Sequence, residues 1–208
     1  MLKIAHRGSP KNENTLEGFL VAQKHGFDVM EIDIRHTKDD VLVLCHDPMV
    51  NGHFVDKTNL SMMEIFLPNL LTLDSYFNHF PTTMVCTYVD IKGSERTAYL
   101  LLKMIYDKKI DTSNLIVGSF NEVHLAYFYD MEIKRAFITA NDYMDVNRDI
   151  LFRNVEIVVI SWEMLSDNFC EYCRKKGKKI YVFTCRTYDE YEHIKQYDID
   201  GIVSDIIL

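Results

Sequence analysis

The chain has 208 residues, of which 48% are hydrophobic and 26% are charged, a balance that can bury a core and excludes a disordered or collagen-like protein. Asp and Glu outnumber Lys and Arg by 31 to 23, and no basic run is present, which argues against nucleic acid as a partner and against a polybasic membrane anchor. The richest apolar stretch, residues 99–106, is too short to span a bilayer, so we predict no stable membrane association.

Short apolar runs rich in β-branched residues alternate along the chain with longer segments of helical periodicity. The expected strands are Lys3–His6, Val29–Ile34, Met84–Ile91, Leu115–Gly118, Arg135–Thr139, Glu156–Ile160, Lys179–Thr184 and Gly201–Ser204. The expected helices cover residues 14–25, 72–79, 94–108, 121–130, 143–152, 167–176 and 187–196. Asn14 lies three residues before Glu17, which is the spacing of a capping box, so we interpret Asn14 as the N-cap of the first helix.

Strands that alternate with helices need crossover connections, which predict a parallel sheet. Eight strands in 208 residues leave about 26 residues for each strand–helix unit. Eight such units close into a barrel more naturally than they form an open sheet, because closure removes both edges. We therefore predict an α/β protein, a (β/α)8 TIM barrel in a single domain over residues 1–208, with an open doubly wound sheet as the alternative.

One segment departs from the strand–helix alternation. Asp39-Asp40 precedes the apolar run Val41–Leu44, a pattern that predicts a hairpin after the second strand. Residues 47–70 are then interpreted as a loop with one short helix.

Charged and titratable residues collect at the C-terminal ends of the first three helix-connected strands, the rim where barrel enzymes keep their active sites. They are His6 and Arg7 after the first strand, Glu31 and Asp33 on the second, His46 after the hairpin, and Asp90 and Lys92 on the third. Ser119 ends the next strand and is a weaker candidate for the same rim, whereas Trp162 is interpreted as barrel packing.

The three acidic residues of this rim are close enough to need a counter-charge. Glu31 and Asp33 are two residues apart on one strand, so their carboxylates share a face at a spacing of about 7 Å, where their repulsion is roughly 2.4 kcal/mol. Asp90 adds a third acid from the neighbouring strand. Such an all-oxygen cluster suits a hard divalent cation, Mg²⁺ or Ca²⁺. The alternative is a salt-bridged barrel mouth without a metal, in which Arg7 and Lys92 neutralise the acids.

The two histidines at the rim predict acid–base chemistry. Imidazole titrates near neutrality, so one of His6 and His46 can act as the base while the other acts as the acid, and the sequence does not separate their roles.

Cysteine usage bears on location: five scattered cysteines, an odd number, indicate reduced thiols, and the N-terminus has no apolar signal core. We therefore predict a cytoplasmic protein.

An ordered series of short motifs resembles the glycerophosphodiester phosphodiesterase family. The matching segments are Ile4-Ala5-His6-Arg7-Gly8, Glu13-Asn14-Thr15, Glu31-x-Asp33, Thr37-x-Asp39-Asp40, His46-Asp47-Pro48, Asp90-Ile91-Lys92, Ser119-Phe120 and Asp200-Gly201-Ile202-Val203-x-Asp205. The resemblance runs from end to end of the chain, and its most specific part lies in residues 4–48.

The resemblance implies a metal-dependent TIM-barrel hydrolase that splits glycerophosphodiesters into glycerol 3-phosphate and an alcohol. It implies that His6 and His46 are the acid–base pair, and that a cyclic phosphate forms from the substrate's own hydroxyl, with direct attack by water as the alternative. By the same resemblance Glu31, Asp33 and Asp90 hold the cation, Arg7 contacts the phosphate, and Lys92 lies beside the metal and the glycerol end.

The sequence also departs from that family. Asp90 stands where the family usually has Glu, and Phe183 stands where a Trp is common. The segment after His46-Asp47 is short, so we expect the family's insertion domain to be absent. With Asp as the third ligand, the chain also resembles the sphingomyelinase D-like phospholipases. A phosphodiesterase for lysophospholipids or sphingolipids is therefore one alternative. A non-catalytic barrel that binds a phosphorylated ligand is another.

Overall fold

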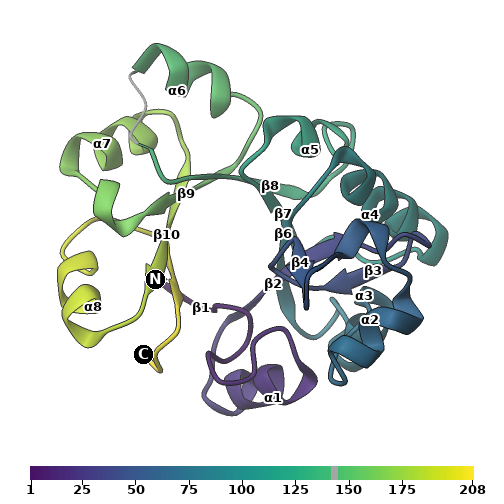
Figure 1. Cartoon of the computed structure of the whole chain (residues 1–208). Coiled ribbons are helices and arrows are strands. Elements are labelled where there is room, and N and C mark those ends of the chain that lie inside the picture. Colours follow the sequence, from purple (N-terminus) through teal and green to yellow (C-terminus); the bar gives the residue numbers. More distant parts are fainter. Residues whose placement is uncertain (142–144) are drawn as a thin grey trace.

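Eight parallel strands follow one another around a closed sheet in this computed structural model, which describes residues 1–141 and 145–208 (Figure 1). They are β1 (Leu2–Ala5), β2 (Val29–His36), β6 (Cys86–Ile91), β7 (Leu115–Ser119), β8 (Lys134–Thr139), β9 (Ile157–Ser161), β10 (Lys179–Cys185) and β11 (Gly201–Ser204). β1 pairs with both β11 and β2, which closes the ring. The predicted TIM barrel is confirmed, and the open-sheet alternative is wrong.

Helices surround the strands on the outside of the ring (Figure 1). They are α1 (Leu16–Lys24), α3 (Leu73–His79), α4 (Glu95–Lys108), α5 (Glu122–Ala126), α6 (Asp145–Leu151), α7 (Asp167–Lys175) and α8 (Tyr188–Ile194), with the 3-10 turn η2 (Trp162–Met164) after β9. All seven expected helices are present; positions 143 and 144 of the expected helix 143–152 lie outside the described residues. Among the helices of the described residues, none has both the length and the apolar character that a membrane crossing requires.

Alternate residues of each strand belong to different layers of the core. On β2, Met30, Ile32 and Ile34 pack in the outer hydrophobic cluster beneath the helices. Val29, by contrast, belongs to the cluster that fills the barrel interior. The predicted alternation of side chains between the two faces of this strand is therefore confirmed. It turns Glu31 and Asp33 toward the barrel axis.

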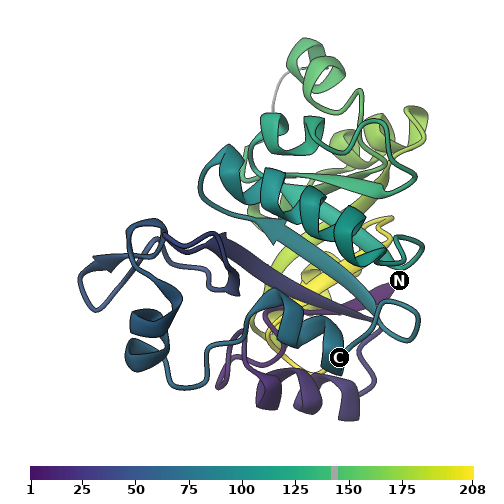
Figure 2. The same ribbon diagram turned by 90° about the vertical axis from the view of Figure 1, so that its right-hand side faces the viewer.

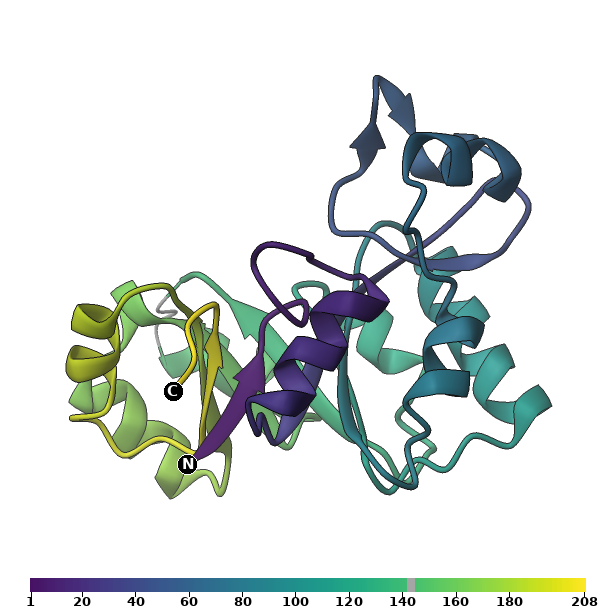
Figure 3. The same cartoon turned by 90° about the horizontal axis from the view of Figure 1, so that it is seen from below.

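A small lobe projects from the barrel between β2 and α3 (Figures 2 and 3). β3 (Leu42–Leu44) returns antiparallel to β2, as the predicted hairpin requires. The chain then forms β4 (Met49–Val50), β5 (His53–Phe54), the 3-10 turn η1 (Val55–Lys57) and α2 (Leu60–Phe66). Val43, Cys45, Val55 and Met63 bury a cluster of their own. Residues 47–70 are more regular than the predicted loop with one short helix.

Candidate active site

A pocket of about 370 Å³ opens at the end of the barrel where the parallel strands terminate. Its walls include all seven residues that the sequence placed at the rim: His6, Arg7, Glu31, Asp33, His46, Asp90 and Lys92. The barrel geometry therefore brings together side chains from β1, β2, the β3 turn and β6.

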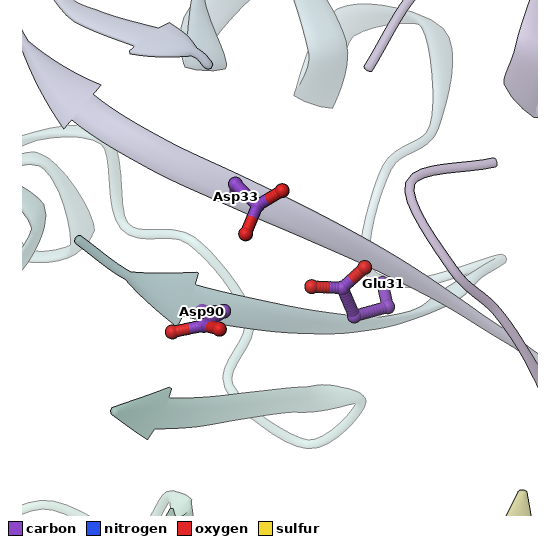
Figure 4. Close-up of side chains that lie close together, drawn as sticks. All are labelled: Glu31, Asp33 and Asp90. Atoms are coloured by element: carbon purple, nitrogen blue, oxygen red, sulfur yellow. The ribbon is translucent and has the colours of Figure 1, made fainter. Parts of the chain in front are cut away.

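The three acidic residues form one buried cluster (Figure 4). Asp33 on β2 is in register with Asp90 on β6, and Glu31 lies two residues before Asp33 on the same face. One carboxylate oxygen from each residue lies within 4.8 Å of the others. Because Glu31, Asp33 and Asp90 are only 4%, 1% and 5% exposed, water does little to screen their charges.

Two basic residues, Arg7 and Lys92, pair with this acid cluster. The Arg7 backbone amide donates to Glu31 Oε2 at 2.8 Å, and Arg7 Nε lies 2.9 Å from Asp33 Oδ2. Lys92 Nζ lies 2.5 Å from Asp90 Oδ2 and 3.3 Å from Asp33 Oδ1. Asp33 is thus held by both cations, whereas Glu31 and Asp90 each contact one of these two residues.

The pKa shifts follow that difference in pairing. Burial alone would raise the pKa of Asp33, but Lys92 and Arg7 outweigh burial and hold the pKa of Asp33 below its usual range. Burial and the Asp33 charge raise the pKa of Glu31 well above its ordinary value. Burial also raises the pKa of Asp90 to about 6, in spite of the attraction of Lys92. Two of the three carboxylates are therefore short of positive charge.

The acid cluster fits a divalent cation. Asp90 Oδ1 is buried and has no hydrogen-bond partner among residues 1–141 and 145–208, so one carboxylate oxygen of the cluster is unpaired. The donor set is entirely carboxylate oxygen, which Mg²⁺ and Ca²⁺ prefer. Three acids against two cations also leave an excess of negative charge for a metal to balance.

The loop between β1 and α1 holds Arg7 in place. Arg7 has a left-handed φ of 52°, and the chain then passes so close to α1 that a Cβ on Gly8 would lie 2.8 Å from the Gly18 carbonyl carbon. Only glycine fits there.

Asn14 in the same loop is not the helix cap that the sequence predicted. Thr15 caps α1, its hydroxyl accepting from the Gly18 amide. The buried Asn14 side chain instead donates to Asp33 Oδ2 at 3.1 Å and accepts from the Asp33 amide at 3.2 Å. The prediction failed because the Asn–x–x–Glu spacing describes local capping, whereas a neighbouring strand offered the better partner.

His6 is oriented by an aspartate from the other end of the chain. Its Nδ1 lies 2.7 Å from Asp205 Oδ1, and the two side chains are 12% and 17% exposed. Because Nδ1 is engaged, Nε2 is the nitrogen left for other partners. Asp205 follows β11, which pairs with β1, so closure of the barrel creates this contact. Asp205 belongs to the last of the motifs that resemble the family, and the sequence alone assigns it no role.

His46 reaches the same pocket through the β2–β3 hairpin. The Cys45 amide donates to the Asp33 carbonyl at 3.0 Å, which fixes the next residue beside the acid cluster. Arg35 Nε donates to the His46 carbonyl at 2.9 Å. The His46 ring is 41% exposed, and its Nδ1 lies 2.8 Å from Asp47 Oδ1, an aspartate that is itself 73% exposed.

The opposite wall of the pocket comes from the second half of the chain and is largely apolar. Its apolar members are Phe120, Ile138, Val159, Trp162, Phe183 and Val203, and Ser161, Glu163, Thr184 and Arg186 add polar groups. The Phe120 and Phe183 rings meet edge to face at 5.8 Å. Trp162, interpreted from the sequence as packing, thus also faces the pocket.

Ser119 is buried against the carbonyl of Ile91 and the ring of His124 and is not part of the described pocket lining.

A family profile matches the part of the chain that contains the charged residues of the pocket. Residues 6–92 match the profile of the glycerophosphoryl diester phosphodiesterase family. A glycerophosphodiester phosphodiesterase of Caldanaerobacter subterraneus is 26% identical over an alignment of 231 residues that covers 98% of this chain and 93% of that protein.

Solved structures with the same fold cover nearly the whole chain. A glycerophosphodiester phosphodiesterase from Parabacteroides distasonis superposes with a TM-score of 0.87 at 19% identity, covering 99% of this chain and 93% of that one. An Oleispira antarctica phosphodiesterase, solved in complex with the product sn-glycerol-3-phosphate, gives a TM-score of 0.87 at 19% identity, covering 100% and 94%.

The profile match spans the acid cluster, both of its cations and both histidines, and the relatives align over the whole barrel. The chain is therefore similar to the glycerophosphoryl diester phosphodiesterase family over residues 6–92, and to a glycerophosphodiester phosphodiesterase, a phosphoric diester hydrolase, over nearly its whole length.

Proposed function

We propose that the protein hydrolyses small-molecule glycerophosphodiesters to glycerol 3-phosphate and an alcohol, with a divalent cation held by Glu31, Asp33 and Asp90. The observation that carries this proposal is the convergence of those three carboxylates, two cations and two histidines on one pocket. The Oleispira relative, whose structure contains sn-glycerol-3-phosphate, supports the choice of substrate class.

Charge stabilisation is the first requirement of the reaction. A phosphodiester carries one negative charge, and its transition state gathers more charge on the non-bridging oxygens. A bound Mg²⁺ or Ca²⁺ supplies positive charge that stabilises those oxygens. The Arg7 guanidinium contacts the phosphate, and Lys92 lies beside it at the glycerol end. Both cations keep their protons, because Asp33 and its neighbours outweigh burial and raise the pKa of Arg7 and of Lys92.

Proton transfer is the second requirement, and His6 and His46 perform it. One imidazole removes the proton from the substrate's glycerol hydroxyl next to the phosphate, and that oxygen attacks phosphorus to form a cyclic phosphate. The other imidazole protonates the alcohol as its bond to phosphorus breaks. Water then opens the ring while the two imidazoles exchange roles. An internal nucleophile accounts for a pocket without an activated Ser or Cys among the described lining residues.

The location proposed for the protein remains the cytoplasm. All five cysteines lie in the described part of the chain and are free thiols, which is the state that a reducing compartment maintains.

A substrate panel tests the proposed function. The purified protein is assayed with glycerophosphocholine, glycerophosphoethanolamine, lysophosphatidylcholine and sphingomyelin, each with Mg²⁺, with Ca²⁺ and with a chelator. We expect metal-dependent release of glycerol 3-phosphate from the first two. Turnover of only the lipid substrates would favour a lysophospholipid or sphingolipid phosphodiesterase. Tight binding of these diesters without any turnover would indicate a non-catalytic barrel.

The cyclic intermediate has its own test. Turnover is stopped early and the products are resolved by phosphorus NMR. We expect a transient cyclic glycerol phosphate. If glycerol 3-phosphate forms with no cyclic species at any time, and isotopic oxygen from water enters in the first step, direct attack by water is the route.

A further inference from the structure

The hydroxyl of Tyr88 is a buried polar group without a partner. Tyr88 is 2% exposed, and its hydroxyl forms no hydrogen bond with any part of the chain that the structure describes. A buried hydroxyl without a hydrogen-bond partner destabilises the folded protein. Folded proteins rarely keep such a group unless water, an ion or a ligand satisfies it.

Tyr88 lies at the boundary between the dry barrel interior and the polar pocket. It is two residues before Asp90 on β6, so both side chains face the barrel axis. Its ring belongs to the apolar cluster inside the barrel, together with Ile4 and Tyr181. Tyr88 also lines the pocket. It is in register with Glu31 on β2, so it contributes a polar group to the buried side of the pocket, beside the acid cluster.

The neighbouring strand holds the Tyr88 ring in one position. Gly118 on β7 is in register with Asp90, and a Cβ added there would lie 2.4 Å from Tyr88 Cε2 and 2.8 Å from the Tyr88 hydroxyl oxygen. The ring thus occupies the space that a side chain at position 118 would need. The close approach of Gly118 therefore confines the Tyr88 ring on this side.

The depth of Tyr88 indicates which part of a substrate meets it. Two residues line the open end of the pocket. Phe120 is 48% exposed, and the Arg186 side chain is 60% exposed. The alcohol of a glycerophosphodiester varies in size and needs the open end. The glycerol is common to every substrate and carries hydroxyls that pair with a phenol, which is protonated at neutral pH and both donates and accepts.

We propose that Tyr88 is a substrate-binding residue whose hydroxyl forms a hydrogen bond with the glycerol part of the bound diester. This inference rests on the proposed function and adds to it a contact that fixes the glycerol end. It also gives a role to a phenol that lies beside Glu31 in the barrel interior and packs against a glycine.

Calorimetric titration of the Tyr88→Phe variant tests the proposal, because this change removes one oxygen and keeps the ring. The probes are sn-glycerol 3-phosphate and inorganic phosphate, both at saturating Mg²⁺. We expect the Kd of glycerol 3-phosphate to rise about tenfold and the Kd of inorganic phosphate to stay unchanged, as loss of one hydrogen bond to glycerol requires. The ligand-free variant melts at the same temperature as the wild type or higher.

Tyr181→Phe is the matched control, since Tyr181 is also 2% exposed in the interior cluster but is not among the residues that line the pocket. It leaves both Kd values unchanged. The Tyr88 assignment is overturned if glycerol 3-phosphate binds Tyr88→Phe within about twofold of wild type, if both probes weaken equally, or if Mg²⁺ alone binds less tightly. A wild type that neither binds glycerol 3-phosphate nor hydrolyses diesters overturns the proposed function as well.

Discussion

The two halves of the barrel contribute different things to the pocket. Residues up to 92 supply the acid cluster, its two cations and both histidines, whereas β7–β11 supply a wall that is mostly aliphatic and aromatic. The family profile matches the first half, residues 6–92. The comparison shows that the acid cluster, its two basic partners and both histidines come from three adjacent barrel strands and the β2–β3 hairpin, whereas the remaining strands close the barrel and shape the pocket.

One side-chain contact of a pocket histidine crosses this division. Asp205, from the second half, contacts His6 across a sequence separation of 199 residues. Its counterpart for His46 is Asp47, the very next residue. One histidine therefore depends on closure of the barrel for its orientation, and the other depends only on a local turn.

The largest effect is expected from removing either histidine of the first half. His6→Ala and His46→Ala each lower kcat by on the order of 10²–10⁴ while the circular dichroism spectrum and thermal midpoint stay near wild type. His25→Ala is the control, because His25 is exposed at the end of α1 and is not part of the pocket lining. Near-normal turnover of either pocket variant would refute the acid–base assignment.

A smaller effect is expected from neutralising one acid of the cluster. Glu31→Gln keeps the shape of the side chain and removes its charge, so Mg²⁺ affinity measured by calorimetry falls by about 10–100-fold, and activity falls with it. Glu17→Gln, an exposed change on α1, serves as the control. If Glu31→Gln binds Mg²⁺ as tightly as wild type, Glu31 is not a ligand.

The two histidine–aspartate pairs give a sharper contrast of smaller size. Asp205→Asn removes a half-buried charge that orients His6, so we expect kcat to fall about tenfold, with little change in KM and a shifted pH profile. Asp47→Asn alters a pair that water screens, because Asp47 is 73% exposed, and we expect kcat to change by less than about threefold. Equal effects of the two variants would show that burial does not distinguish the pairs.

Strand periodicity made the fold predictable. Runs such as Val29–Ile34 alternate with helical segments, and eight repeats of that alternation close most simply as a barrel. The seven rim residues were predictable for a related reason: parallel strands end at one face, so polar residues at strand ends meet there.

Contacts that depend on packing were not predictable. Asn14 was interpreted as a cap because local spacing says nothing of the neighbouring strand, where it binds Asp33. Asp205 pairs with His6 only because β11 meets β1. Tyr88 lies within an expected strand, and its unpaired hydroxyl is visible only in three dimensions. Ser119 sits at a strand end like the rim residues but turns into the core, where it meets His124.

The smallest effect concerns pH and sharpens the charge contrast between the halves. Burial raises the pKa of Asp90 from 3.8 to about 6, so between these values the folded protein binds more protons at this site than the unfolded chain does. Stability from this group is therefore present at low pH and is lost as pH rises through about 6. The pKa of Glu31, raised in the same direction, adds to the trend.

A divalent cation reverses that dependence, because it binds the ionised carboxylates and competes with protons. The increase in thermal midpoint on adding Mg²⁺ is therefore larger at pH 7 than at pH 5. In Asp90→Asn the site lacks the group that titrates near 6, so the metal-free variant loses much of its pH trend and the Mg²⁺ effect shrinks at both values. An equal Mg²⁺ shift at pH 5 and pH 7 in the wild type would mean that the ion does not bind these carboxylates, and the charged half would then be a salt-bridged rim rather than a metal centre.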